Sequence, residues 1–304
     1  MLETIIKTEH LTKSFEGNLA VDRLNLDIRR GELYGLVGPD GAGKTTTMRL
    51  LTAIMDPTSG NARVAGCSIL TEGEAIKQKI GYMSQRFGLY EDLTVLENIV
   101  FYADIYEVLE KERPGRIERL LGFSNLTPFK DRLAGKLSGG MKQKLGLACA
   151  LIHTPAVLFL DEPTNGVDPV SRRDFWKILY GLLREGVTIM VSTAYLDEAE
   201  RCTRIGLMHK GKILIEDVPK NVRSSLPHPM IEVWSDNARS SIELIKNLGG
   251  VIAVSLYGDR LHITLEIKVP APELVANLKR LGIDVKDYRD ILPSLEDVFI
   301  SMVE

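Results

Sequence analysis

Hydrophobic and polar positions follow three successive patterns along the chain. Residues 4–36 alternate apolar and polar side chains around turns such as Glu16-Gly17-Asn18, which predicts short antiparallel strands. From Leu33 to about Asp217, short apolar runs alternate with helical patterns. That order predicts an α/β domain with a largely parallel sheet and helices on its faces.

The clearest strands of the second stretch are apolar runs bounded by turn or charged residues, namely Leu33–Val37, Ala156–Leu160 and Val187–Val191. Between them, residues 92–125 and 139–153 carry helical periodicity. We therefore expect a helical subdomain, covering about residues 86–154, inserted into the sheet domain.

The third pattern follows a cluster of prolines. Pro219, Pro227 and Pro229 lie close together, so we interpret residues 219–229 as a linker after a first domain of residues 1–218. The predicted order beyond it is strand 230–234, helix 238–248, strands 251–257 and 260–266, helix 272–281, strand 284–289 and a last helix from Pro293. Gly258-Asp259 between the paired strands is a hairpin signal. Residues 230–304 are predicted to form a small α+β domain of ferredoxin-like order.

A phosphate-binding loop follows the first apolar strand of the second stretch. The pattern G-x-x-x-x-G-K-[ST] and the next residue are matched by Gly38, Pro39, Asp40, Gly41, Ala42, Gly43, Lys44, Thr45 and Thr46. The glycines let successive N–H groups point at phosphate oxygens, Lys44 adds a positive charge, and the Thr45 hydroxyl is placed for Mg²⁺. The alternative is a glycine turn beside a lysine with a buried stem. The strand–loop–helix context favours binding of a nucleoside triphosphate.

An apolar strand, Ala156–Glu162, ends in two acids, Asp161 and Glu162. A carboxylate at the carboxyl end of a strand beside the phosphate loop can hold Mg²⁺ through water, and we assign that role to Asp161. Glu162 then lies one residue further along, where it can polarise the water that attacks the γ-phosphate. The alternative is a buried strand that merely reaches the surface at an acidic turn.

Ser138, Gly139 and Gly140 form a third element before that acidic strand end. Ser138 is a good N-cap, the glycines permit close approach of an anion, and a helix follows. Alone this is an ordinary N-cap. With the phosphate loop and the two acids, the chain resembles the ATP-binding-cassette (ABC) ATPases from residue 4 to about 217. The resemblance implies a P-loop NTPase cassette with a mixed sheet and a helical subdomain, and ATP and Mg²⁺ as ligands.

Three further residues match marks of that family. Gln85 matches the glutamine that touches Mg²⁺ and the attacking water and that senses the membrane partner; alone it is a polar loop residue. Phe15 lies where the family has an aromatic that stacks on adenine, the alternative being core packing. Asp168 matches a loop that crosses the dimer interface, although as a bare Asp-Pro it is only a turn.

The resemblance also implies partners. In this family the phosphate loop of one cassette faces the Ser-Gly-Gly element of another, with ATP between them, so a second cassette is expected, either identical or non-identical and fused. Met141, the segment Phe87–Asn98 and the tail Pro293–Phe299 resemble daunorubicin-resistance-type ATPases, which serve ABC-2 type exporters. The chain is therefore expected to power drug or small-molecule export through a separate ABC-2 permease.

One family mark is missing. The family normally has a histidine at the position of Ala194, where it hydrogen-bonds the γ-phosphate and helps to position the water and Glu162. An alanine methyl cannot donate, and losing one such donor typically costs on the order of 10²–10³ in rate. Tyr195 is a conceivable substitute, although as the next residue it is expected to point elsewhere. We hypothesise that the chain binds ATP normally but hydrolyses it slowly, like the N-terminal cassette of tandem-cassette efflux ATPases.

Composition and spacing limit the alternatives. A net charge of −3 without a polybasic block argues against a nucleic-acid protein. The three scattered cysteines favour plain thiols over disulfides or zinc. No apolar run approaches a spanning length and no signal peptide is evident, so we expect a cytoplasmic protein held on the inner face of the membrane by its permease. Only about 90 residues separate Lys44 from Ser138, which excludes the long coiled coil of DNA-repair ATPases. A regulatory, weakly hydrolysing ATP-binding module stays open as the alternative.

Overall fold

The chain folds into two units that meet in sequence after Glu216. The computed structural model describes residues 3–85 and 88–303. Predictions that touch residues 1, 2, 86, 87 and 304, including Phe87 and the first residues of the helical subdomain, lie outside this described part. Each unit is a body with its own hydrophobic core.

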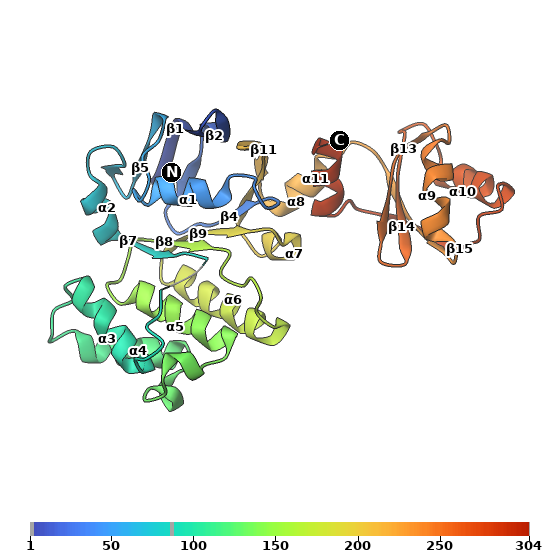
Figure 1. The fold of residues 1–304 in the computed structure, drawn as a ribbon. Helices are drawn as coiled ribbons and strands as arrows, with labels where there is room; N and C mark the ends of the chain where they lie inside the picture. The colour runs from blue at the N-terminus through green and yellow to red at the C-terminus, as the bar shows by residue number, and fades with distance from the viewer. Residues whose placement is uncertain (1–2, 86–87, 304) are drawn as a thin grey trace. The chain divides into compact units, whose positions relative to one another are not determined.

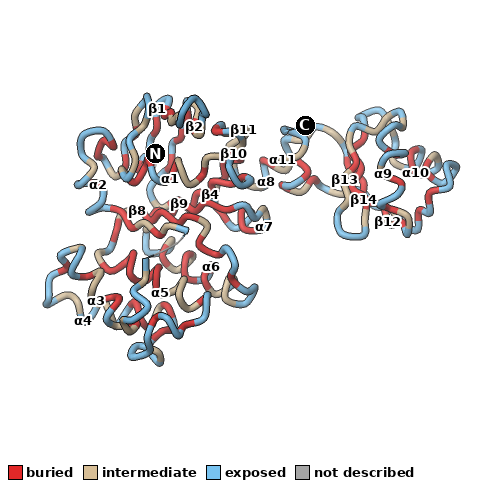
Figure 2. Tube along the Cα trace, in the orientation of Figure 1, coloured by how far each residue is buried: buried red, intermediate tan, exposed pale blue. Residues whose placement is uncertain are grey.

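A six-stranded sheet is the centre of the first unit. Its order is β11-β10-β4-β9-β8-β7, and the pairs from β10 to β7 are parallel, which confirms the largely parallel sheet. The strands are β4 Leu33–Val37, β7 Ile80–Met83, β8 Val157–Asp161, β9 Thr188–Thr193, β10 Arg204–His209 and β11 Lys212–Asp217. β4, β8 and β9 are buried along their whole length, as Figure 2 shows, because both faces of the sheet are covered.

An antiparallel sheet covers one face of this centre. β1 pairs antiparallel with β2, β3 and β5, as the alternating N-terminal pattern predicts. Its strands are β1 Thr4–Phe15, β2 Asn18–Leu24, β3 Asp27–Arg29, β5 Ser59–Val64 and β6 Cys67–Ser68, with helix α2 Gly73–Lys79 beside them. Helix α1 (Lys44–Leu51) lies between the two sheets in Figure 1, and one core joins Leu11 of β1, Met48 of α1 and Leu36 of β4.

Helices cover the other face of the central sheet (Figure 1). They are α3 Val95–Ile105, α4 Arg113–Phe123, α5 Gly139–Leu151 and α6 Pro169–Arg184, with short 3₁₀ turns at Thr127–Phe129 and Ala134–Lys136 and the one-turn helix α7 Leu196–Ala199. The predicted helical stretch 92–125 is two helices, because the chain leaves α3 at Glu107, which has a φ of +52°. α3 starts at a capping box made by Thr94 and Glu97. Within residues 3–85 and 88–303, no helix is long and apolar enough to cross a membrane.

The second unit has the predicted ferredoxin-like order. Its antiparallel sheet runs β13-β14-β12-β15, with the hairpin turn at Gly258-Asp259. The elements are α8 Pro219–Ser224, β12 Met230–Ser235, α9 Ala238–Lys246, β13 Val251–Tyr257, β14 Arg260–Leu265, α10 Ala271–Arg280, β15 Val285–Ile291 and α11 Leu295–Val303.

The expected linker 219–229 needs a correction. Its first half is helix α8, which contacts α11 within the second unit. Pro219 starts this helix, because at the first helical position its missing N–H leaves no backbone bond unmade. The proline cluster therefore begins the second unit rather than separating it from the first.

The two leucines at the end of α10 give a matched test of the second core. Leu278 is fully buried among that core, whereas Leu281 is 49% exposed. We expect Leu278→Ala to lower the free energy of unfolding of the second unit by about 2–5 kcal/mol through a cavity. Leu281→Ala should change it by less than about 0.5 kcal/mol. Urea unfolding followed by Trp234 fluorescence in a Trp176→Phe background measures it, and equal effects of the two variants would contradict this core.

Candidate functional site

The phosphate loop leaves the carboxyl end of β4 and enters α1. Gly38 donates its N–H to the Thr193 carbonyl (3.2 Å), which fixes the loop to the end of β9. Gly43 has a φ of +108°, and a Cβ there would lie 2.2 Å from the Ala20 oxygen, so only glycine fits. A pocket of about 460 Å³ opens over the loop and is lined by Phe15, Ala20, residues 40–46, Gln85, Glu162 and Asn165. Its size suits a small-molecule ligand.

Lys44 is the buried cation of this pocket. Its side chain is 4% exposed, and Nζ donates to the Gly38 carbonyl (2.7 Å) and the Pro39 carbonyl (3.1 Å). Nζ also lies 3.2 Å from Oε1 of Glu162. The lysine is thereby aimed across the loop toward the acidic end of β8.

Asp161 ends β8 directly behind the loop and is 1% exposed. Its Oδ1 accepts hydrogen bonds from Thr45 Oγ1 (3.1 Å) and Ser192 Oγ (2.6 Å). Its Oδ2 is buried, and within the described residues it has no hydrogen-bond partner. A buried carboxylate oxygen without a donor, beside a threonine hydroxyl, fits a hard cation with oxygen ligands. Thr45 and Asp161 therefore suit Mg²⁺.

Glu162 presents its carboxylate to the pocket with both oxygens held. Oε1 lies against Lys44, while Oε2 accepts from Gln85 Nε2 (3.1 Å) and from Asn165 Nδ2 (3.3 Å). The backbone of Glu162 has a φ of +49°, and its N–H donates to the side chain and carbonyl of Ser192. Gln85 was predicted to face the metal ion; in the structure its side-chain amide donates a hydrogen bond to Glu162.

The end of β9 differs from the sequence-based expectation. Ala194 is exposed and offers no donor, as predicted. Tyr195 was expected to point elsewhere, and it does not line the pocket; its hydroxyl instead donates to Asn165 Oδ1 (3.4 Å) and so reaches the network around Glu162 indirectly. Sequence reasoning also missed Asn165 and Ser192. Asn165 lies in the loop that begins with the two acids, and Ser192 pairs in register with Asp161.

The remaining predicted residues divide into two groups. Phe15 is 44% exposed at the pocket edge, with Lys13 Nζ 5.2 Å from its ring centroid, so it is no core residue. Ser138 caps α5 by accepting from the Met141 N–H (3.3 Å), with Gly139 and Gly140 behind it. Asp168 caps α6, and hydrogen bonds from Ser171 and Val170 lower the pKa of its carboxyl group. Ser138, Gly139, Gly140 and Asp168 do not line the pocket of their own chain.

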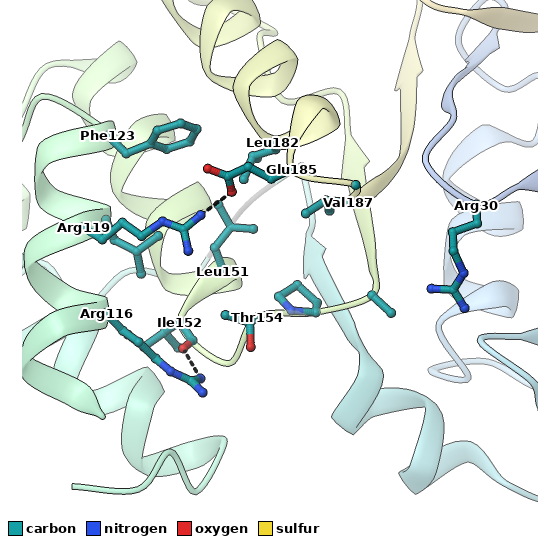
Figure 3. Close-up of a pocket in the computed structure, with 14 residues that line it drawn as sticks. Arg30, Arg116, Arg119, Phe123, Leu151, Ile152, Thr154, Leu182, Glu185 and Val187 are labelled. Carbon is teal, nitrogen blue, oxygen red and sulfur yellow. Dashed lines mark hydrogen bonds and ion pairs between the residues drawn. The ribbon is translucent and has the colours of Figure 1, made fainter. Parts of the chain in front are cut away.

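Another pocket, of about 560 Å³, lies at the amino ends of β8 and β9 between α4, α5 and α6 (Figure 3). Its arginines are already partnered, because Arg119 pairs with Glu185 and Arg116 donates to the Ile152 carbonyl (3.0 Å). The phosphate loop leaves the carboxyl end of β4, at the opposite edge of the parallel sheet. This second pocket is therefore no part of the phosphate-loop site.

The three cysteines are buried and form no disulfide. Burial raises the pKa of the Cys149 and Cys202 thiols above the usual value, which keeps them protonated. Among residues 3–85 and 88–303, no group of three or more His, Cys, Asp or Glu side chains is placed to hold a metal ion.

Comparison with known proteins identifies two matched regions. Residues 21–165 match the family described as ABC transporter, and residues 219–303 match the DrrA1-3-like C-terminal domain of ATP-binding proteins. The chain is 41% identical to the probable multidrug ABC transporter ATP-binding protein YbhF of Escherichia coli over all of this chain. This chain spans about half of that relative's length, namely 53%.

Other relatives match along nearly their whole length. Identity is 32% to the daunorubicin/doxorubicin resistance ATP-binding protein DrrA of Streptomyces peucetius, over 98% of this chain and 92% of that protein. Identity is also 32% to the bacitracin transport ATP-binding protein BcrA of Bacillus licheniformis, over 99% of this chain and 98% of that protein.

Two solved structures share the cassette fold. CbiO1 of Clostridium perfringens has a TM-score of 0.68 at 28% identity, over 73% of this chain and 91% of that one. The cassette MJ0796, solved as a post-hydrolysis dimer bound to ADP and Pi, has a TM-score of 0.64 at 26% identity. The match covers 70% of this chain and 98% of that one.

Asp161→Asn tests the cation site. The substitution keeps the shape but removes the charge, so we expect it to weaken the Mg²⁺-dependent part of ATP binding about 10- to 100-fold. Binding measured in EDTA should hardly change. Titration of a fluorescent ATP analogue with and without Mg²⁺ measures both, with the exposed Asp131→Asn as the matched control. An unchanged Mg²⁺ dependence in Asp161→Asn would place the ion elsewhere.

Proposed function

The chain belongs to the ABC transporter ATP-binding proteins of the DrrA and YbhF drug-resistance type, and on that premise we propose that it binds and hydrolyses ATP to power export through a separate ABC-2 type permease. The single observation that carries hydrolysis is the Glu162 carboxylate, held at the mouth of a phosphate loop by donors to both of its oxygens. The exported cargo is a small molecule or drug, since DrrA and BcrA are named for daunorubicin resistance and bacitracin transport.

The contacts of Lys44 and Glu162 suggest how binding prepares the reaction. Lys44 now shares its ammonium between loop carbonyls and Glu162 Oε1. The γ-phosphate of ATP carries more negative charge and competes for that ammonium, which leaves Oε1 to accept a proton from the attacking water. Oε2 keeps its bonds to Gln85 and Asn165, so the base stays oriented. Mg²⁺ held by Thr45 and Asp161 would neutralise charge on the phosphates.

A second cassette completes the proposed site. Ser138–Gly140 and Asp168 lie outside the pocket of their own chain, yet Ser138 begins α5 with glycines that leave room for an anion. The related cassette MJ0796 is described as a dimer. ATP bound between two cassettes favours the closed state, and hydrolysis removes that preference. Through the permease the chain would lie on the cytoplasmic face of the membrane.

A second candidate function is a regulatory ATP-binding module that pairs with an active, non-identical cassette. Ala194 favours it, because an exposed methyl group replaces a hydrogen-bond donor. Glu162 and its partners oppose it, since a chain that only binds ATP needs no base held on both oxygens.

Glu162→Gln tests the proposal with two readouts. We expect phosphate release to fall about 10²- to 10⁴-fold, because the general base is lost, while ATP still binds. Without hydrolysis, ATP should convert the 33.8 kDa chain into a dimer in light scattering. Ser138→Arg should abolish that dimer, and the exposed Ser240→Arg in the second unit is its matched control.

The same assay separates the two candidate functions. A wild-type rate well above that of Glu162→Gln supports an active ATPase. A wild-type rate equal to it, with a large gain in Ala194→His, would contradict the active ATPase and favour the regulatory module. A chain that stays monomeric with ATP contradicts pairing of identical cassettes.

A further inference from the structure

We propose that Tyr195 is a positioning residue for Glu162 that acts through Asn165. The inference rests on the proposed ATPase function and names a residue for it. The path has two hydrogen bonds. Tyr195 Oη donates to Asn165 Oδ1 (3.4 Å), and Asn165 Nδ2 donates to Glu162 Oε2 (3.3 Å).

The amide of Asn165 gives this path its direction. Ionised Glu162 can only accept hydrogen bonds, so the NH₂ group of Asn165 must face it. A flipped amide would turn its carbonyl oxygen toward the carboxylate, which is repulsive. The carboxylate therefore sets which way the amide faces, and the Tyr195 hydroxyl, by donating to Oδ1 on the other side, holds the amide in place. Tyr195 therefore fixes the position from which Asn165 donates to Glu162, although it does not touch Glu162 itself.

Two further contacts fix the tyrosine. Its backbone N–H donates to Thr193 Oγ1 (3.0 Å), which sets the direction in which the chain leaves β9. The guanidinium of Arg172, on α6, lies 4.6 Å from the ring centroid, within cation–π range. Arg172 is itself held 3.5 Å from Glu198 and 3.8 Å from Asp197. The ring is thus stacked on an anchored cation although it is 38% exposed.

The buried carboxylate of Glu198 links the segments that carry Tyr195 and Asn165. Glu198 is fully buried and accepts hydrogen bonds from Thr193 Oγ1 (2.8 Å) and from Thr164. Thr164 precedes Asn165 in the loop after β8, and Thr193 precedes the Ala194-Tyr195 pair after β9. Glu198 therefore holds the loop of Asn165 and the strand end of Tyr195 at a fixed spacing.

Tyr195→Phe is the direct test, because it removes the hydroxyl and keeps the ring on Arg172. The substitution removes one neutral hydrogen bond. From the usual net free energy of such a bond, we expect kcat to fall about three- to tenfold. The Kd for ATP, from titration of a fluorescent analogue, and the Tm should stay at wild-type values. Tyr180→Phe is the matched control, since it removes a tyrosine hydroxyl that donates to the Arg201 carbonyl (3.2 Å) away from the pocket. We expect it to leave kcat unchanged.

A double-mutant cycle separates positioning from a merely structural role. Asn165→Leu should lower kcat at least as much as Tyr195→Phe, and adding Tyr195→Phe to it should lower kcat no further. In a Glu162→Gln background, Tyr195→Phe should leave the residual rate unchanged. Additive losses of kcat, a wild-type kcat in Tyr195→Phe, or a loss confined to the Kd for ATP would each overturn the inference alone. A wild-type rate equal to that of Glu162→Gln would overturn both the inference and the proposed ATPase.

Discussion

The carboxylate of Glu162, held on one oxygen by a buried lysine and on the other by two amides, is the constraint on which the rest of the site depends. Lys44, Gln85 and Asn165 come from three separate segments, and each donates to the same acidic group. A carboxylate enclosed by donors stays oriented, which a general base requires. Substrate phosphates compete for only one of these donors, Lys44. We therefore expect the site to change one contact when ATP binds and to keep the others.

Parallel strand pairing brings these segments together. Asp161 pairs with Ser192, and Val37 pairs with Thr193, so the carboxyl ends of β4, β8 and β9 share one edge of the sheet. Gly38, Glu162 and Ala194 each follow one of these strands, so a difference at residue 194 lies at the same sheet edge as the proposed base, Glu162. The loop of Asn165 and the turn of Tyr195 meet at the same edge, which is why a tyrosine beside the alanine can reach the base through an amide.

The parts that could be predicted from the sequence are those set by neighbouring residues. Four predicted features depend on local chemistry, and the structure has each in its predicted local setting. They are the phosphate loop, the acids at 161 and 162, the N-cap Ser138 and the hairpin at Gly258-Asp259. Contacts between distant segments were missed. Nothing local says that the Tyr195 hydroxyl meets Asn165, because that contact depends on the packing of Arg172 and Glu198. Helix α8 was missed because three nearby prolines suggest a linker, whereas Pro219 only starts a helix.

The most direct measurement is a crystal structure of the wild-type chain with Mg²⁺ and a non-hydrolysable ATP analogue. The account predicts phosphates over residues 38–46, Lys44 Nζ moved from Glu162 to the γ-phosphate, and the ion between Thr45 and Asp161. Glu162 Oε2 should still accept from Gln85 and Asn165, with Oε1 facing the γ-phosphate. A nucleotide bound elsewhere, or a Glu162 carboxylate that leaves both amides when the nucleotide binds, would contradict the account.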